Sequence, residues 1–371
     1  MVIKVAEPSL GENVRRNVLD CLDEGWISSA GKYIQRFETE FAEYCGSEYA
    51  VATNNGTTAL HLALVALDLR PGDEVIIPNL TYIATANAVA YCGAVPVFVD
   101  SDEASFNIDA KSIENAITDK TVGIIPVHLY GHPCDMKSIM SIAQKRGLWI
   151  LEDAAEAHGA EVDGKRVGTF GNAATFSFFG NKVITTGEGG CITTNDQELA
   201  VKMRRLRSQG MDTNRRYWFP EIGFNYRMTN IQAAIGVAQL EDLENLLSQR
   251  ARIAQHYWRE LASNTQLKLP SAPPNMRHSM WMFTPRIIGA SAEDRDAVMR
   301  IMERQDIETR PVFYPMSVMP PYFNPDANTP IAIKLSNEGL NLPTHANLSE
   351  EDVARVCAVF QASVAEVMGS K

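Results

Sequence analysis

The feature that most constrains the fold of this chain is a series of short apolar segments between about residues 48 and 195. Each segment is rich in Val and Ile and is apolar on both faces, which is typical of buried strands in a parallel sheet. The predicted strands are Tyr49–Thr53, Glu74–Pro78, Val95–Asp100, Val122–Val127, Leu148–Glu152, Ala174–Phe178 and Cys191–Thr194.

Amphipathic helical patterns occupy several intervals between these strands. Thr57–Leu69 carries Leu and Ala at helical spacing, and Asp135–Arg146 follows the same period up to Gly147, a typical helix stop. Alternation of strands and helices predicts an α/β fold, with a mostly parallel central sheet and helices on both faces.

The pattern changes after about residue 240. Ile231 to Trp258 predicts one long helix or two joined helices, and proline-rich connections follow. Beyond them, Trp281–Ile288 resembles a strand, and Glu350–Val367 predicts a final helix.

With 371 residues, the chain is too long for one ordinary domain. We predict a large α/β domain over residues 1–244 and a smaller C-terminal α+β domain over residues 245–371. We expect the N-terminal segment, about residues 1–15, to pack on the small domain or on a partner subunit.

Charge and cysteine content argue against several classes of protein. The net charge of -11 disfavours non-specific binding to nucleic acid or to an anionic membrane. The six cysteines are scattered, without a pair or cluster at metal-binding spacing, so we expect reduced thiols and no metal site. No apolar run has the length of a signal peptide or a membrane span, which favours a cytoplasmic protein.

Asp153 comes at the end of a predicted central strand. Ligands of an open parallel sheet bind beyond the carboxyl ends of its strands, so Asp153 faces the expected site. A buried carboxylate there needs a cationic or hydrogen-bonding partner. The alternative is that Asp153 caps a short helix over Ala154–Ala157.

Lys182 follows the predicted strand Ala174–Phe178 and is surrounded by apolar and small residues, with Ser177 five positions before it. One interpretation is a surface lysine with its charge in water. The other is a desolvated amine whose lowered pKa makes it a nucleophile. The residues alone leave both interpretations open.

A third feature lies where the first strand ends and a helix begins. Gly56 turns the chain, and the helix predicted from Thr57 offers free backbone amides beside two hydroxyl groups. Such a helix start binds phosphate without any lysine. The alternative is an ordinary capped helix.

Together these features suit pyridoxal 5′-phosphate (PLP). PLP needs a lysine for a Schiff base, an acid at its pyridinium nitrogen and an anion site. An aromatic residue, Tyr82, also follows the second predicted strand.

Longer motifs accompany these residues and carry a family resemblance. They include Pro78-Asn-Leu-Thr-Tyr-Ile-Ala-Thr-Ala-Asn, Pro126-Val-His-Leu-Tyr-Gly-His and Asn225-Tyr-Arg-Met-Thr-Asn-Ile-Gln-Ala-Ala-Ile-Gly. Over nearly its whole length the chain resembles the sugar aminotransferases of the DegT/DnrJ/EryC1/StrS family. The resemblance implies a PLP enzyme of fold type I, a homodimer, and a nucleotide-linked keto sugar as substrate.

The resemblance also implies roles for individual residues. Lys182 matches the Schiff-base lysine, Asp153 the acid paired with the pyridine nitrogen, and Tyr82 the aromatic that stacks on the ring. Some relatives carry His at the lysine position and act as dehydratases, so Lys182 favours transamination. Because Lys182 supplies the general base, His128 and His132 are expected to serve in packing or hydrogen bonds.

The phosphate of PLP has matching residues as well. Gly56, Thr57 and Ser177 match the phosphate-binding groups of the family. Asn225 matches an asparagine that reaches the phosphate in the neighbouring subunit, which implies composite active sites in a homodimer.

Glu156 departs from the commonest family pattern. Many relatives carry Gln at this position, beside the phenolic oxygen of PLP. A carboxylate facing a phenolate would repel it, so the protonation state of Glu156 is an open question.

Three stretches resemble family members that act on a GDP-linked sugar: Phe176 to Gly190, Arg216-Tyr-Trp and Arg310-Pro-Val-Phe-Tyr-Pro-Met. They imply GDP-4-keto-6-deoxymannose as amino acceptor and L-glutamate as amino donor. The alternatives are a UDP- or dTDP-linked keto sugar, dehydration without net transamination, and a non-catalytic regulatory or binding protein of the same fold.

The residues that would contact the sugar nucleotide are less distinct. Arg215 and Arg216 stand beside two aromatic residues and are candidates either for diphosphate or base binding or for a subunit interface. Tyr314 and His345 are candidates for facing the sugar.

Overall fold

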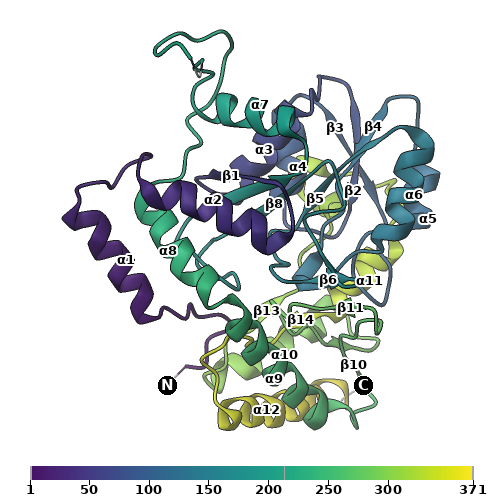
Figure 1. The fold of residues 1–371 in the computed structure, drawn as a ribbon. Helices are drawn as coiled ribbons and strands as arrows, with labels where there is room; N and C mark the ends of the chain where they lie inside the picture. The colour runs from purple at the N-terminus through teal and green to yellow at the C-terminus, as the bar shows by residue number, and fades with distance from the viewer. Residues whose placement is uncertain (1, 213, 370–371) are drawn as a thin grey trace.

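A central sheet of seven strands organises the computed structural model, which describes residues 2–212 and 214–369 (Figure 1). The strands are β1 (Tyr49–Thr53), β2 (Glu74–Pro78), β3 (Val95–Val99), β4 (Thr121–Ile124), β5 (Trp149–Asp153), β8 (Ala173–Ser177) and β9 (Gly190–Thr194). Their order is β1-β9-β8-β5-β4-β2-β3, and only β9 runs antiparallel to its neighbours. The predicted mostly parallel sheet is confirmed, and each of its strands overlaps one predicted segment.

Strand alternation determines which helices cover each face of the sheet, because successive side chains point to opposite faces. On β5, Leu151 joins the core under one helical layer and Ile150 the core under the other. The first layer consists of α3 (Gly56–Ala66), α4 (Ala84–Tyr91) and α7 (Gln197–Arg207). The second consists of α2 (Lys32–Cys45), α5 (Ala110–Ala116), α6 (Met136–Arg146) and α8 (Asn230–Glu241). The predicted helices on both faces are therefore present.

Helix ends follow local chemistry. Asp135 caps α6 by accepting a hydrogen bond from the Ser138 amide, and Gly147 ends the helix at a φ of 68°. This left-handed backbone favours glycine. The pattern over Ile231 to Trp258 forms two joined helices, because α8 ends at Glu241 and α9 (Leu243–Leu261) begins two residues later.

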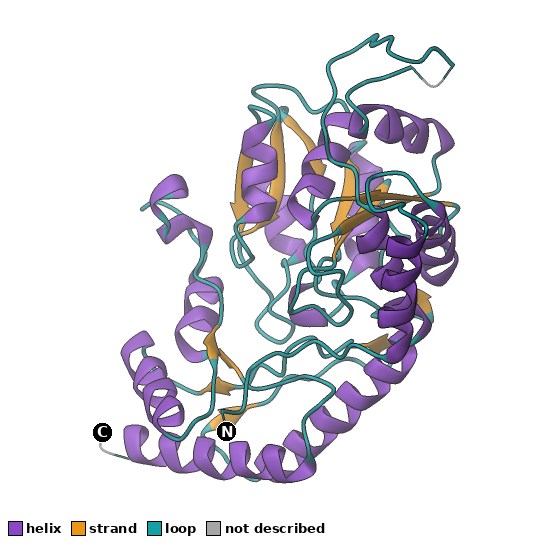
Figure 2. Cartoon of the chain, turned by 90° about the vertical axis from the view of Figure 1, so that its left-hand side faces the viewer, coloured by secondary structure: helices purple, strands orange, loops and turns teal. Residues whose placement is uncertain are grey.

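The C-terminal part forms a second group of elements below the sheet (Figures 1 and 2). Its helices are α9, α10 (Ala292–Arg304), α11 (Pro330–Glu338) and α12 (Glu350–Met368). Its short strands are β10 (Leu267–Lys268), β12 (Arg286–Ile287), β13 (Arg310–Pro311) and β14 (Leu340–Asn341). A further small sheet joins β6 (Glu161–Val162), β7 (Lys165–Arg166) and β11 (Met276–Arg277). Within the predicted strand Trp281–Ile288, only Arg286 and Ile287 form a strand, which is β12.

The start of the chain lies against this C-terminal part. Ile3 forms a parallel bridge with Ile307, and Val5 accepts a hydrogen bond from the Thr344 amide. The chain then continues into α1 (Glu12–Asp23), which packs on α8. The domain boundary at residue 244 stays a prediction. Among the helices described, none combines the length and the apolar character needed to cross a membrane.

A cluster of phenylalanines links α2 to the strand that leads into the Lys182 loop. The Phe37 and Phe178 rings meet edge to face, with centroids 5.2 Å apart, and Phe41 contacts both Phe176 and Phe178 in the same way. All four side chains are fully buried. The cluster therefore fixes the end of β8, from which the loop emerges.

Phe37→Ala tests this packing. We expect the free energy of unfolding to fall by about 3–5 kcal/mol, because a fully buried ring leaves a cavity. Phe323→Ala is the matched control, since Phe323 is 66% exposed, and its effect should stay within about 0.5 kcal/mol. Urea denaturation of both variants at equal protein concentration gives the comparison. Equal losses would contradict the assigned role of the cluster.

Candidate active site

The carboxyl ends of the parallel strands meet at one edge of the sheet, and the loops that follow them surround a cavity of about 740 Å³. This is where an open α/β sheet binds its ligand. The predicted cofactor contacts that line the cavity are Gly56, Thr57, Tyr82, Asp153, Glu156, Ser177 and Lys182. Lys182 lies 126 positions after Gly56 in the sequence, and the fold brings both residues to the same cavity.

Lys182 is largely withdrawn from water, and only 11% of its side chain is exposed. Its Nζ lies 3.5 Å from Glu156 Oε1 and 3.9 Å from the centre of the Trp281 ring. Burial lowers the pKa of the Lys182 amine, although Glu156 and Asp153 act in the opposite direction. The alternative of a surface lysine is wrong.

Asp153 ends β5 with its side chain almost completely buried. Its Oδ2 accepts a hydrogen bond of 2.7 Å from the Thr85 hydroxyl, and its Oδ1 accepts one of 3.2 Å from the Ala155 amide. Burial raises the pKa of Asp153, and these two hydrogen bonds oppose the shift. The residues after it form turns rather than a helix, so the helix-cap alternative is wrong.

Glu156 lies between Lys182 and the backbone of Tyr130. Its Oε2 accepts a hydrogen bond of 2.9 Å from the Tyr130 amide, while Oε1 faces Lys182. Burial raises the pKa of Glu156, whereas the Lys182 charge lowers it. The cavity therefore contains two buried carboxyl groups near one amine.

The start of α3 is the candidate anion site. Asn55 caps the helix by accepting a 2.9 Å hydrogen bond from the Thr58 amide, so the predicted cap exists. The amides of Gly56 and Thr57 belong to the first turn, where helix geometry provides no intrahelical partner. A Cβ on Gly56 would lie 2.8 Å from Ser177 Cβ. The helix start and the Ser177 side chain are therefore in close contact and form one concave site.

Three cavity residues were not predicted from the sequence to belong to the site. Trp281 donates a 2.7 Å hydrogen bond from Nε1 to the Asn181 carbonyl, which places its ring under Lys182. Tyr130 stacks between Trp281 and Phe313, at centroid distances of 6.1 and 5.3 Å. Arg310 adds a positive charge to the wall. Phe313 and Tyr314, which follow Arg310, were the sequence signal for this wall. The contacts of Trp281 and Tyr130 join segments that are distant in the sequence, so no local pattern could reveal them.

The substrate candidates lie in different places. Tyr314 lines the cavity, whereas His345 is buried outside the set of lining residues. Arg215 and Arg216 lie on the loop between α7 and α8, which extends away from the sheet (Figure 1). Asn225 is exposed at the end of this loop and does not line the cavity of its own chain. The roles of these residues stay predictions.

His128 and His132 form hydrogen bonds, as predicted. His128 Nδ1 accepts from the Cys134 amide, so its Nε2 donates to Glu152 at 3.2 Å. The ring nitrogens of His132 face the carbonyl oxygens of Pro133 and Ser271. Neither histidine lines the cavity that contains Lys182.

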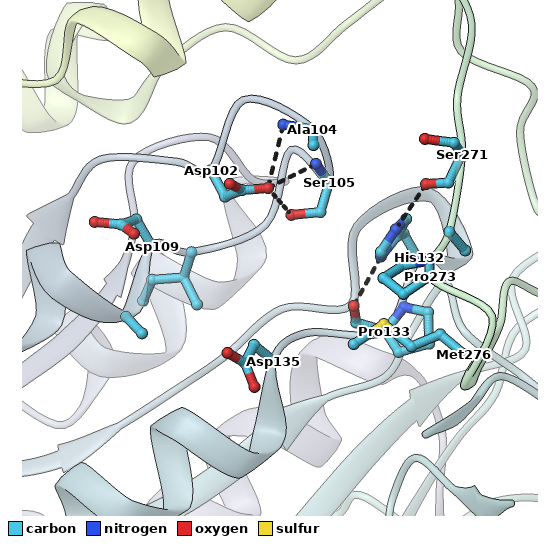
Figure 3. Close-up of a pocket in the computed structure, with 13 residues that line it drawn as sticks. Asp102, Ala104, Ser105, Asp109, His132, Pro133, Asp135, Ser271, Pro273 and Met276 are labelled. Carbon is cyan, nitrogen blue, oxygen red and sulfur yellow. Dashed lines mark hydrogen bonds between the residues drawn. The ribbon is translucent and has the colours of Figure 1, made fainter. Parts of the chain in front are cut away.

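A second cavity of about 510 Å³ lies beside His132 (Figure 3). Three carboxylates line it, and each has a local structural role. Asp109 caps α5, Asp135 caps α6, and Asp102 accepts hydrogen bonds within its own loop. Within residues 2–212 and 214–369, no His, Cys, Asp and Glu side chains form a group suited to a metal ion.

The larger cavity matches the chemical requirements of PLP. The cofactor requires an amine, a carboxyl group for its ring nitrogen and an anion site for its phosphate. Lys182, Asp153 and the concave site at Gly56 and Ser177 supply these groups around one space, with Tyr82 at its wall. The fold and this site define a PLP-dependent transferase of fold type I.

Comparison with known proteins gives the family. A model of the DegT/DnrJ/EryC1/StrS aminotransferase family matches residues 8–361. The GDP-perosamine synthase of Caulobacter vibrioides is 55% identical over 360 residues, which cover 96% of this chain and 97% of that protein. The GDP-perosamine synthase of Escherichia coli O157:H7 is 48% identical over 355 residues, or 96% of both proteins.

Structural comparison agrees with this result. The PLP form of Streptococcus pneumoniae Spr1654 matches with a TM-score of 0.94 at 28% identity, covering 99% of this chain and 100% of that one. The protein belongs to the DegT/DnrJ/EryC1/StrS aminotransferase family. The predicted PLP cofactor and aminotransferase class are confirmed.

Gly56→Ala tests the anion site. The added Cβ would lie 2.8 Å from Ser177 Cβ and force the two elements apart. We expect the Kd for PLP to rise about tenfold or more, which corresponds to about 1.4 kcal/mol. Titration of the apoprotein with PLP, followed by absorbance, measures this. Gly11→Ala is the control, because a Cβ there meets nothing within 4 Å. An unchanged Kd in Gly56→Ala would contradict the assignment.

Proposed function

We propose that this enzyme transfers the amino group of L-glutamate to C4 of GDP-4-keto-6-deoxymannose, giving GDP-perosamine and 2-oxoglutarate. The observation that carries the proposal is the buried amine of Lys182, in one cavity with Asp153 and an anion site. The high identity to two GDP-perosamine synthases supports the choice of substrate. Ping-pong kinetics are expected, because 2-oxoglutarate leaves before the sugar binds and the enzyme retains the amino group between the two steps.

Each residue of the candidate site would have its own role in catalysis. PLP, when bound, supplies an electron sink and carries the amino group from one substrate to the other. Lys182 would hold the cofactor and, once released, move a proton at the glutamate α-carbon and at C4 of the sugar. Asp153 would keep a proton on the ring nitrogen, and Gly56, Thr57 and Ser177 would bind the phosphate. Burial of Lys182 keeps water away from its amine.

We further propose a homodimer with composite sites. Asn225 is exposed and lies outside the cavity of its own chain, so a role at a phosphate requires the cavity of a second copy. The loop that precedes it extends away from the sheet (Figure 2), which supports contact with another subunit. Closed twofold dimers are the commonest way to place the same residue in two equivalent sites.

The product of the reaction tests the substrate. With glutamate and GDP-4-keto-6-deoxymannose, we expect a product whose mass corresponds to replacement of the ketone oxygen by an amine, with equal formation of 2-oxoglutarate. Mass spectrometry should be run in parallel with UDP- and dTDP-linked keto sugars. Preference for one of these would reassign the nucleotide. A deoxysugar product without glutamate consumption would indicate dehydration, and no conversion of any sugar would favour a binding or regulatory protein.

Subunit complementation tests the composite site. Lys182→Ala should abolish turnover and the absorbance of the cofactor linked to the lysine, and Asn225→Ala should lower turnover. Reassembly of equal amounts of the two variants should restore roughly a quarter of wild-type activity, since half of the dimers are mixed and each has one intact site. Activity no higher than the average of the two separate variants would contradict composite sites.

A further inference from the structure

We propose that Glu156 is the proton acceptor for Lys182 and becomes a neutral carboxylic acid when the lysine turns into a nucleophile. In this step the N–H bond of the ammonium breaks, the proton binds Glu156 Oε1, and the electron pair stays on Nζ of Lys182. No oxidant, reductant or further reactant is needed. The inference deepens the proposed function, on which it rests, by assigning a step that prepares Lys182 for it.

The geometry first shows a site built for a charged lysine. Lys182 Nζ lies 3.5 Å from Glu156 Oε1, and its other contact is the face of the Trp281 ring, 3.9 Å from the centroid. An aromatic face attracts a cation and not a neutral amine. Carboxylate and ring therefore hold the lysine as an ammonium, a form that cannot attack a carbonyl carbon.

The geometry next identifies the group that can take the proton. Of the carboxylates in the described part of the chain, only that of Glu156 lies within 4.0 Å of Lys182 Nζ. Its second oxygen is already fixed by the Tyr130 amide, so Oε1 remains directed at Lys182. An amide side chain at this position would keep the hydrogen-bonding shape but could not accept a proton.

The buried surroundings reduce the free-energy cost of the transfer. Burial raises the pKa of Glu156 and lowers that of Lys182, so the two values move toward each other. Asp153 raises the pKa of Glu156 further, and Arg310 lowers that of Lys182. Both charges disappear in the transfer, which removes the cost of keeping a charged pair out of water.

The transfer also changes the hydrogen bonds that Glu156 can form with a ligand in the cavity. A neutral carboxylic acid has an O–H donor, whereas a carboxylate has only acceptors. After the transfer, Glu156 can donate a hydrogen bond to an anionic oxygen.

Titration of Lys182 in the apoprotein tests the inference without turnover. Competitive labelling with acetic anhydride across pH, read by peptide mass spectrometry, gives the apparent pKa of this amine. In Glu156→Gln it should fall by about one unit or more, because an opposite charge within a few ångströms is lost. Glu188→Gln is the matched control. It makes the same chemical change in the same cavity, and its carboxylate forms no ion pair with Lys182.

Every outcome of the titration either supports or contradicts the role of Glu156 as proton acceptor. A fall in Glu156→Gln but not in Glu188→Gln, partly reversed in Glu156→Asp, supports the proton acceptor. An unchanged or raised value in Glu156→Gln, or an equal fall in both variants, overturns it. If Glu156→Gln does not fold, Glu156→Ala is read in the same way. The two tests are independent. A negative labelling experiment would contradict only the role of Glu156, and absence of the aminated sugar would contradict only the proposed function.

Discussion

The burial of three ionisable side chains around one cavity is the interaction on which the rest of this structure depends. Lys182, Asp153 and Glu156 are all largely withdrawn from water, and an uncompensated charge in that environment would be costly. The protein compensates with short-range partners. The Thr85 hydroxyl donates to Asp153, the Tyr130 amide donates to Glu156, and Glu156 in turn faces the amine of Lys182. The same withdrawal from water makes each group responsive to a ligand that changes the local charge.

The sheet makes this concentration of charge possible. Parallel strands place the ends of β1, β2, β5 and β8 at one edge, so that a helix start, a carboxylate and a serine side chain meet without long loops. The antiparallel strand β9 has a separate effect. Because β9 pairs with β8, the residues between these two strands form a loop at the edge of the sheet. The hydrogen bond from the Phe178 amide to the Gly189 carbonyl closes this loop. Lys182 lies on this loop, four residues after Phe178 of the phenylalanine cluster.

The C-terminal part contributes residues to the cavity and is therefore part of the candidate active site. Trp281, Arg310 and Tyr314 come from this part and line the wall opposite the sheet. A hydrogen bond from Trp281 to the Asn181 carbonyl joins that wall to the residue beside the reactive lysine. Movement between the two parts would change the surroundings of Lys182 directly. Cofactor binding, lysine reactivity and the packing of the C-terminal part are thus physically coupled.

The strands, the helix stop at Gly147 and the choice of Lys182 and Asp153 as candidate site residues could be read from the sequence. Strand burial and helix ends are properties of neighbouring residues, and long motifs carried the family likeness. Tertiary structure alone decided that Lys182 is buried rather than exposed, and that Trp281 and Tyr130 surround it. The Trp281 hydrogen bond joins positions 100 residues apart. Local patterns of apolar residues report which face of a strand or helix is buried. The burial of a single polar side chain such as Lys182, and the distant side chains that it meets, are fixed only when the sheet and the C-terminal part pack together.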